Sequence, residues 1–136
     1  VKAAYNRWED QRLGVVQKVG KGSNPWTEHY SALQAEVPDA ADDDTQLNTA
    51  LIVRLDEAER IVIAGEASSH CVKATVEHLA QHLPSRRLDK LVLLTDAMSP
   101  VTGFEAQATA FLSDLQRQGA RLATCAEVLP LLQASA

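Results

Sequence analysis

The hydrophobic positions of this chain form two patterns, short continuous runs and stripes that repeat every three or four residues. Runs rich in β-branched residues are typical of strands buried on both faces, and the stripes are typical of helices with one apolar side. The runs lie at 15–19, 61–64, 91–94 and 121–125, and the stripes at 3–13, 45–58, 72–83 and 104–118. Strands that alternate with helices predict an α/β fold, a three-layer arrangement in which a mostly parallel sheet has helices on both faces.

The turn between the run at 61–64 and the stripe at 72–83 contains a cysteine. Gly65 ends the run, small residues follow, and Cys71 comes directly before the stripe, which places it at a helix N-terminus. Unpaired backbone N–H groups and the positive end of the helix dipole favour a thiolate there, and the thiolate is the nucleophile. The same amides could hold an oxyanion. The alternative is that Cys71 is a small apolar filler after a buried strand.

A lysine follows the first run in the same way. The run at 15–19 ends at Gly20, which places Lys21 beyond the carboxyl end of a predicted strand, where parallel sheets bind ligands. If this strand lies beside the one at 61–64, Lys21 can approach Cys71 and its positive charge would stabilise a thiolate. Lys18 lies inside the run and is the weaker candidate. The alternative is a loop lysine that only faces water.

A long loop at 23–44 connects this region to the next helix, and such connections often have a function. Trp26 and Tyr30 could form an apolar wall for a planar substrate, or they could anchor the loop to the core. The three aspartates at 42–44 are predicted to begin the next helix, with Asp44 or Thr45 as its N-cap.

The remaining candidates are interpreted as structural. Cys125 is predicted at the end of the last strand, and Asp96 is predicted to be a cap or turn residue. His78 and His82 are four residues apart on a helix and could in principle bind one metal ion. They lack the HExxH pattern, however, so we interpret them as two exposed histidines.

Composition restricts the class of protein. With 136 residues, 46% of them hydrophobic, the chain is predicted to form a single domain over 1–136. The net charge of −5 and the lack of a basic run argue against a nucleic acid or a membrane as partner. No segment approaches the ~18 apolar residues of a membrane span. Two cysteines do not form a disulfide framework, and the first residues do not have the pattern of a signal peptide, so we expect a cytoplasmic location.

The segments around these residues resemble a known family. Gly65-Glu66-Ala67-Ser68-Ser69-His70-Cys71-Val72 is similar to the nucleophile turn of the nicotinamidase/isochorismatase-like cysteine hydrolases. Further segments that carry the resemblance are 73–75, 21–25, 28–32, 45–48 and 92–100. The resemblance implies an isochorismatase-like hydrolase fold.

The resemblance also implies an activity, that of an amidohydrolase related to the nicotinamidases. Such an enzyme cleaves a carbon–nitrogen amide bond of a small molecule through a thioester, here on Cys71. It implies that Lys21 stands beside the thiol, that the backbone N–H groups of Ala67 and Cys71 hold the oxyanion, and that the Glu66-Ala67 peptide bond is cis. Glu66 and His70 differ from the residues that are more common at these positions in nicotinamidases, so nicotinamide is not implied as the substrate. Members that cleave isochorismate lack the cysteine, which makes that reaction the less expected one.

Family members carry a further N-terminal region, with a strand that ends in a catalytic Asp and with metal-binding Asp and His residues. The present chain begins at Val1 without that region, so we expect a domain that is incomplete at its N-terminus. No cofactor is expected within the chain, and a divalent metal such as zinc is expected only through the missing region. We expect another chain segment, or a partner subunit in a homo-oligomer, to cover the exposed sheet edge.

Two alternatives to an active enzyme stay open. One is an inactive fragment or interaction module of the same fold, because the catalytic Asp is absent; on this basis we expect the chain alone to hydrolyse no amide. The other is a flavodoxin-like binding domain in which Cys71 is only a filler.

Overall fold

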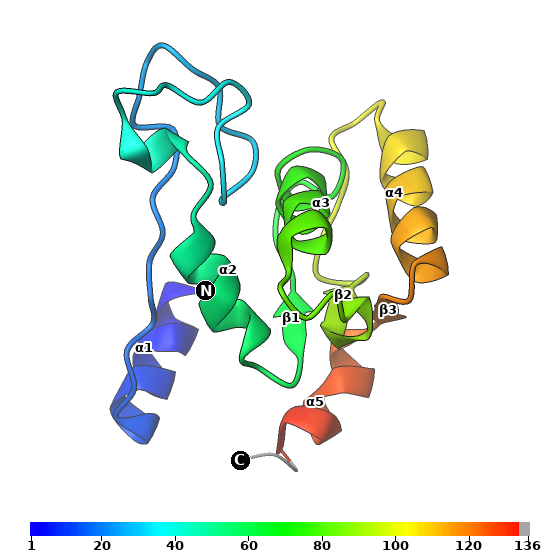
Figure 1. The fold of residues 1–136 in the computed structure, drawn as a ribbon. Helices are drawn as coiled ribbons and strands as arrows, with labels where there is room; N and C mark the ends of the chain where they lie inside the picture. Colours follow the sequence, from blue (N-terminus) through cyan, green and yellow to red (C-terminus); the bar gives the residue numbers. More distant parts are fainter. Residues whose placement is uncertain (134–136) are drawn as a thin grey trace.

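The computed structural model describes residues 1–133. Figure 1 shows three short strands with helices before, between and after them. The elements are α1 (Lys2–Arg12), η1 (Asp43–Thr45), α2 (Thr49–Asp56), β1 (Ile61–Ile63), α3 (Cys71–His82), η2 (Leu88–Lys90), β2 (Leu91–Leu94), α4 (Glu105–Arg117), β3 (Arg121–Ala123) and α5 (Cys125–Gln133). None of the helices in this part of the chain combines the length and the apolar character that crossing a membrane requires.

The strands form a parallel sheet in the order β1-β2-β3. Ile61 is in register with Leu91, and Val92 is in register with Arg121. Each parallel connection contains a helix, α3 between β1 and β2 and α4 between β2 and β3, because parallel neighbours require a long crossover. The predicted α/β class with a parallel sheet is therefore confirmed.

Alternate strand residues pack on opposite faces of the sheet, as a period of two requires. Leu91 and Leu93 are fully buried against residues of α2, α3 and α4, including Val76 of α3 and Phe111 of α4. Their neighbour Val92 faces the other way, toward a smaller cluster that includes Val128 of α5. Both faces of the sheet thus carry helices, as predicted, and the larger core lies on the side of α3.

The predicted strand at 15–19 is wrong. The segment is extended but pairs with no strand of the described chain, and Val15 is 84% exposed. Its hydrogen bonds go to helices: the Val16 N–H donates to Glu9 of α1 at 2.8 Å, and Arg54 of α2 donates to Gln17. β-branched residues favour a strand only where a partner strand and a buried face are present, and here the segment has neither.

The next helix begins later than predicted. α2 starts at Thr49, and its N-cap is Asn48, whose side-chain oxygen accepts a hydrogen bond from the Leu51 N–H at 3.0 Å. Thr45 is instead buried, and its hydroxyl donates to the carbonyl oxygens of Asp39 and Asp42. Because this hydroxyl is used inside the loop, it cannot cap α2.

Cys125 does not end a strand. β3 stops at Ala123, and Cys125 is the first residue of α5. The Glu127 carboxylate accepts from the Thr124 N–H at 2.7 Å, and the Glu127 N–H donates to the Thr124 hydroxyl at 3.4 Å. This reciprocal pair is a capping box, and the order Thr-Cys-Ala-Glu in the sequence is its signature.

Candidate active site

The turn between β1 and α3 presents Cys71 at the first position of its helix. The Ala67 carbonyl accepts hydrogen bonds from the His70 N–H at 3.0 Å and the Val72 N–H at 3.1 Å, and these bonds close the turn onto the helix. The Glu66-Ala67 peptide bond is cis, as the resemblance implies. Within residues 1–133 the N–H groups of Ala67 and Cys71 donate to no protein acceptor.

Lys21 lies beside the thiol although it is 50 positions away in the sequence. Its Nζ is 3.3 Å from Cys71 Sγ, and it also donates to the carbonyl oxygens of His29 at 2.8 Å and Tyr30 at 2.7 Å. An ammonium group has three N–H donors, and here they meet three acceptors. Because one acceptor is the sulfur, the positive charge is held where it stabilises a thiolate.

The route by which Lys21 reaches the thiol differs from the predicted one. No strand carries it, because the preceding segment is extended chain outside the sheet. The carbonyl groups of the following loop hold the side chain instead. Lys18 is not at the site: its Nζ lies 5.5 Å from the centre of the Tyr5 ring, a cation–π contact with α1.

A cavity of about 250 Å³ adjoins the thiol. Its lining is mainly apolar, and its ionisable members are Lys21, Tyr30, Glu66 and Cys71. The full lining is Lys21, Tyr30, Ala32, Ile63, Ala64, Gly65, Glu66, Cys71, Val72 and Thr75. Of the two predicted wall residues, Tyr30 lines this cavity. Trp26 does not, and it is 89% exposed.

Sequence reasoning missed a group of aromatic rings around His70, the residue before the thiol. His70, which directly precedes Cys71, has its ring centre 4.8 Å from that of Phe104 and 6.0 Å from that of Tyr30. Its Nδ1 is 2.8 Å from the Ser69 hydroxyl, which fixes the orientation of the ring. The stripe at 104–118 predicts Phe104 on the inner face of a helix, yet Phe104 precedes α4 and is 43% exposed. No signal in the sequence marks its contact with His70, because the two rings come from separate connections.

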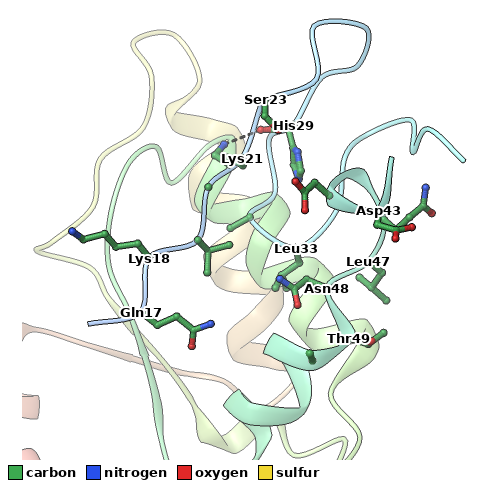
Figure 2. A pocket seen from close by; sticks show the side chains of 16 residues that line it. Gln17, Lys18, Lys21, Ser23, His29, Leu33, Asp43, Leu47, Asn48 and Thr49 are labelled. Atoms are coloured by element: carbon green, nitrogen blue, oxygen red, sulfur yellow. Dashed lines mark hydrogen bonds between the residues drawn. The ribbon is translucent and has the colours of Figure 1, made fainter. Parts of the chain in front are cut away.

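A larger cavity of about 690 Å³ also has Lys21 in its lining, together with residues 17–20 and the start of α2 (Figure 2). It is polar, with Asp43, Asn48 and His29 among its lining residues, and Cys71 is not part of it. Burial lowers the pKa of His29, and the positive charge of Lys21 lowers it further, while Glu36 acts in the opposite direction. We place the reactive centre at the smaller cavity because that cavity contains the thiol.

The described residues do not fit a metal centre. No group of three or more His, Cys, Asp or Glu side chains in residues 1–133 is arranged to hold a metal ion. The sequence indicates two exposed histidines, His78 and His82; His82 is exposed, but His78 is only partly exposed. Their ring centres are 6.3 Å apart, and His78 Nδ1 is 2.9 Å from the hydroxyl of buried Ser31. His78 thus has a partner within the fold.

The second thiol has the opposite electrostatic environment. Asp96, at the carboxyl end of β2, accepts a hydrogen bond from the Cys125 N–H at 2.8 Å. A hydrogen bond to this carboxylate, together with burial and the negative charge, raises the pKa of the Cys125 thiol. The Cys125 N–H in turn lowers the pKa of Asp96. Asp96 therefore caps α5, in agreement with its predicted cap role.

Comparison with known proteins finds a similar fold. The fold is similar to that of the pyrazinamidase of Pyrococcus horikoshii, solved in complex with zinc, with a TM-score of 0.55 and 22% sequence identity. The match covers 78% of this chain and 49% of that chain, so the chain corresponds to about half of the pyrazinamidase. No family model matches the sequence, and no curated protein is significantly similar to it. At this level of identity the likeness shows a shared α/β fold.

Proposed function

We propose that this chain carries the nucleophile and the oxyanion site of a cysteine hydrolase that cleaves the carbon–nitrogen amide bond of a small molecule. The observation that carries the proposal is the 3.3 Å contact between Lys21 Nζ and Cys71 Sγ at the start of α3. The similarity to a pyrazinamidase, whose name describes an amide hydrolase, supports it. So does the resemblance of the turn at 65–72 to the nicotinamidase-like hydrolases.

In the proposed reaction, the Cys71 thiolate attacks the carbonyl carbon of the amide. The carbonyl oxygen becomes an oxyanion, which accepts hydrogen bonds from the free N–H groups of Ala67 and Cys71. The carbon–nitrogen bond then breaks, and the nitrogen leaves as ammonia after gaining a proton. Water cleaves the resulting thioester, which releases the carboxylic acid and restores the thiol.

The role of Lys21 in this scheme is electrostatic. Its three donors are engaged with the sulfur and two carbonyl oxygens, so it is positioned to stabilise the thiolate before attack. Proton transfer to ammonia and activation of water need a further acid–base group. The carboxylate among the residues that line the cavity, Glu66, is occupied by two hydrogen bonds from Ser99.

This occupation of Glu66 favours a second candidate, a binding module of the same fold that captures a carbonyl compound but does not turn it over. The two candidates differ in the steps after the thiolate has attacked. General acid–base help is worth ~10²–10⁴-fold, so a site without it would stall before the amide bond breaks or at the thioester.

The test measures ammonia release and acyl transfer together. The chain is incubated with pyrazinamide, nicotinamide and small carbamoyl amides; ammonia is followed enzymatically, and the quenched protein is analysed by mass spectrometry. Steady ammonia release with an acyl group on Cys71 would support the hydrolase and would contradict the expectation that the chain alone hydrolyses no amide. A thioester on Cys71 that forms once and is not turned over would select the binding module. An acyl group on Cys125 would contradict both.

A further inference from the structure

Five hydrogen bonds join the nucleophile turn to the connection that follows β2. Two are bonds between backbone groups: the Gly65 N–H donates to Ala97 O at 3.0 Å, and the Ser68 N–H donates to Ser99 O at 2.9 Å. In a third, the Val101 N–H donates to the Ser69 side-chain oxygen at 3.0 Å. The other two connect Ser99 to the Glu66 carboxylate, from the Ser99 N–H at 3.2 Å and from its hydroxyl at 2.9 Å. The turn is thus held from outside by a segment 33 positions away.

Ser99 has a special place among these contacts because it binds the residues on both sides of Ala67. Its N–H and hydroxyl hold the side chain of Glu66, and its carbonyl oxygen holds the backbone of Ser68. We call Glu66 and Ser99 together the clasp. The carbonyl side of Ala67 is fixed separately by the His70 and Val72 amides. Among the described residues the N–H of Ala67 has no acceptor, and it lies between two neighbours that Ser99 holds.

We propose that the clasp positions the Ala67 N–H for the oxyanion, so that Glu66 and Ser99 are positioning residues of the reaction. This inference rests on the proposed function, because it assigns them to the oxyanion site of that reaction. Oxyanion stabilisation depends on donors that are already aimed at the developing charge. Small displacements of such groups are costly, since a misplacement of about 1 Å can lower a rate by ~10²-fold.

The clasp is separate from the contact that activates the sulfur. Lys21 is held by the carbonyl groups of His29 and Tyr30, and within residues 1–133 it has no hydrogen bond or ion pair with Glu66 or Ser99. Loss of the clasp should therefore weaken stabilisation of the oxyanion and leave the thiolate intact. This separation distinguishes a positioning role from a general structural role, because a structural defect would affect both the oxyanion site and the thiolate.

The experiment compares two reactions of Cys71 in the unmodified chain and in the variants Glu66→Ala, Ser99→Ala and Glu66→Gln. Iodoacetamide alkylation is a displacement that forms no oxyanion, so it reports on the sulfur alone. Pyrazine-2-carbaldehyde adds to the thiolate and forms a hemithioacetal oxyanion without any leaving group. Its dissociation constant therefore reports on the oxyanion site whether or not the chain hydrolyses amides.

We expect aldehyde binding to weaken by about 10-fold or more in Glu66→Ala and by less in Ser99→Ala, which keeps the backbone donor and acceptor. Glu66→Gln retains one acceptor oxygen and should recover part of the affinity. At each pH the rate of Cys71 alkylation should stay within about twofold of the rate in the unmodified chain, because Lys21 is untouched. Where amides are hydrolysed, kcat should fall with little change in KM.

A matched control is Glu127→Ala, which removes a carboxylate that accepts from the N–H and hydroxyl of Thr124 in the same way but lies at α5. It should leave aldehyde binding unchanged. Equal aldehyde affinity in Glu66→Ala and the unmodified chain would overturn the inference. So would an alkylation rate that falls in Glu66→Ala as much as its aldehyde affinity does, or an unmodified chain that forms no aldehyde adduct. An aldehyde adduct without any amide hydrolysis would contradict the proposed hydrolase, and the positioning role of the clasp would still be supported.

Discussion

The two cysteines of this chain occupy the same kind of position and differ in their neighbours. Cys71 begins α3 and Cys125 begins α5, so each thiol lies at the positive end of a helix dipole. The ammonium of Lys21 lies 3.3 Å from the sulfur of Cys71, whereas the carboxylate of Asp96 acts on the thiol of Cys125 and raises its pKa. A helix N-terminus alone therefore does not define a reactive thiol here; the sign of the neighbouring charge distinguishes the two.

Exposure and electrostatics act in opposite directions at these thiols. Cys125 is exposed, whereas Cys71 is only partly accessible. If access controlled reactivity, Cys125 would react first; if thiolate population controlled it, Cys71 would. The comparison can thus be tested with each thiol as the internal reference for the other.

The largest expected effect concerns turnover. Cys71→Ala should lower amide hydrolysis by about 10⁴-fold or more, because the covalent route is lost. Cys125→Ala, the matched control, should keep the rate within about twofold. Ammonia release measured for both variants checks this, and equal rates from Cys71→Ala and the unmodified chain would remove Cys71 from the mechanism.

The next effect is selectivity of alkylation in the unmodified chain. With limiting iodoacetamide at pH 7, Cys71 should be labelled more than about 10-fold faster than Cys125, since Lys21 favours one thiolate and Asp96 disfavours the other. Peptide mapping by mass spectrometry gives both rates from one sample. Preferential labelling of Cys125 would show that access outweighs charge.

Removing the cation should shrink that selectivity. In Lys21→Met the rate of Cys71 alkylation, followed across pH, should fall by roughly 10-fold at pH 7, because the positive charge next to the sulfur is gone. Lys18→Met is the control, because Lys18 contacts the Tyr5 ring instead of the thiol. An unchanged profile in Lys21→Met would mean that the Lys21–Cys71 contact has no electrostatic effect in solution.

The smallest effect is expected at the second thiol. The Asp96 carboxylate raises the pKa of Cys125, so Asp96→Asn should lower that pKa and increase the thiolate fraction at any pH below it. Alkylation of Cys125 at pH 8 should rise about threefold, a modest change because exposed charges are screened. Asp89→Asn, which alters an exposed carboxylate paired with Arg87, should have no effect. A slower reaction in Asp96→Asn would show that its cap of α5 matters more than its charge.

The sequence was most informative where a structural signal is local. The apolar run at 61–64, Gly65 and the stripe at 72–83 predict Cys71 at a helix start, and α3 begins there. The run at 15–19 is equally apolar, but a strand needs a partner to bond with, and the extended segment bonds to helices instead. The run at 121–125 predicts Cys125 at a strand end, although Thr124 and Glu127 carry the capping-box spacing that marks the start of α5.

Local patterns in the sequence were enough to establish the α/β class, most of the helices and strands, and the position of one thiol at a helix N-terminus, because these follow from periodicity and from residues adjacent in the chain. The charges around each thiol and the contacts that hold the nucleophile turn arise only in the folded molecule. Lys21 reaches Cys71 across 50 positions, Asp96 reaches Cys125 across 29, and Ser99 reaches Glu66 across 33. Contacts of this kind depend on how the connections fold over the sheet edge, which no local pattern specifies.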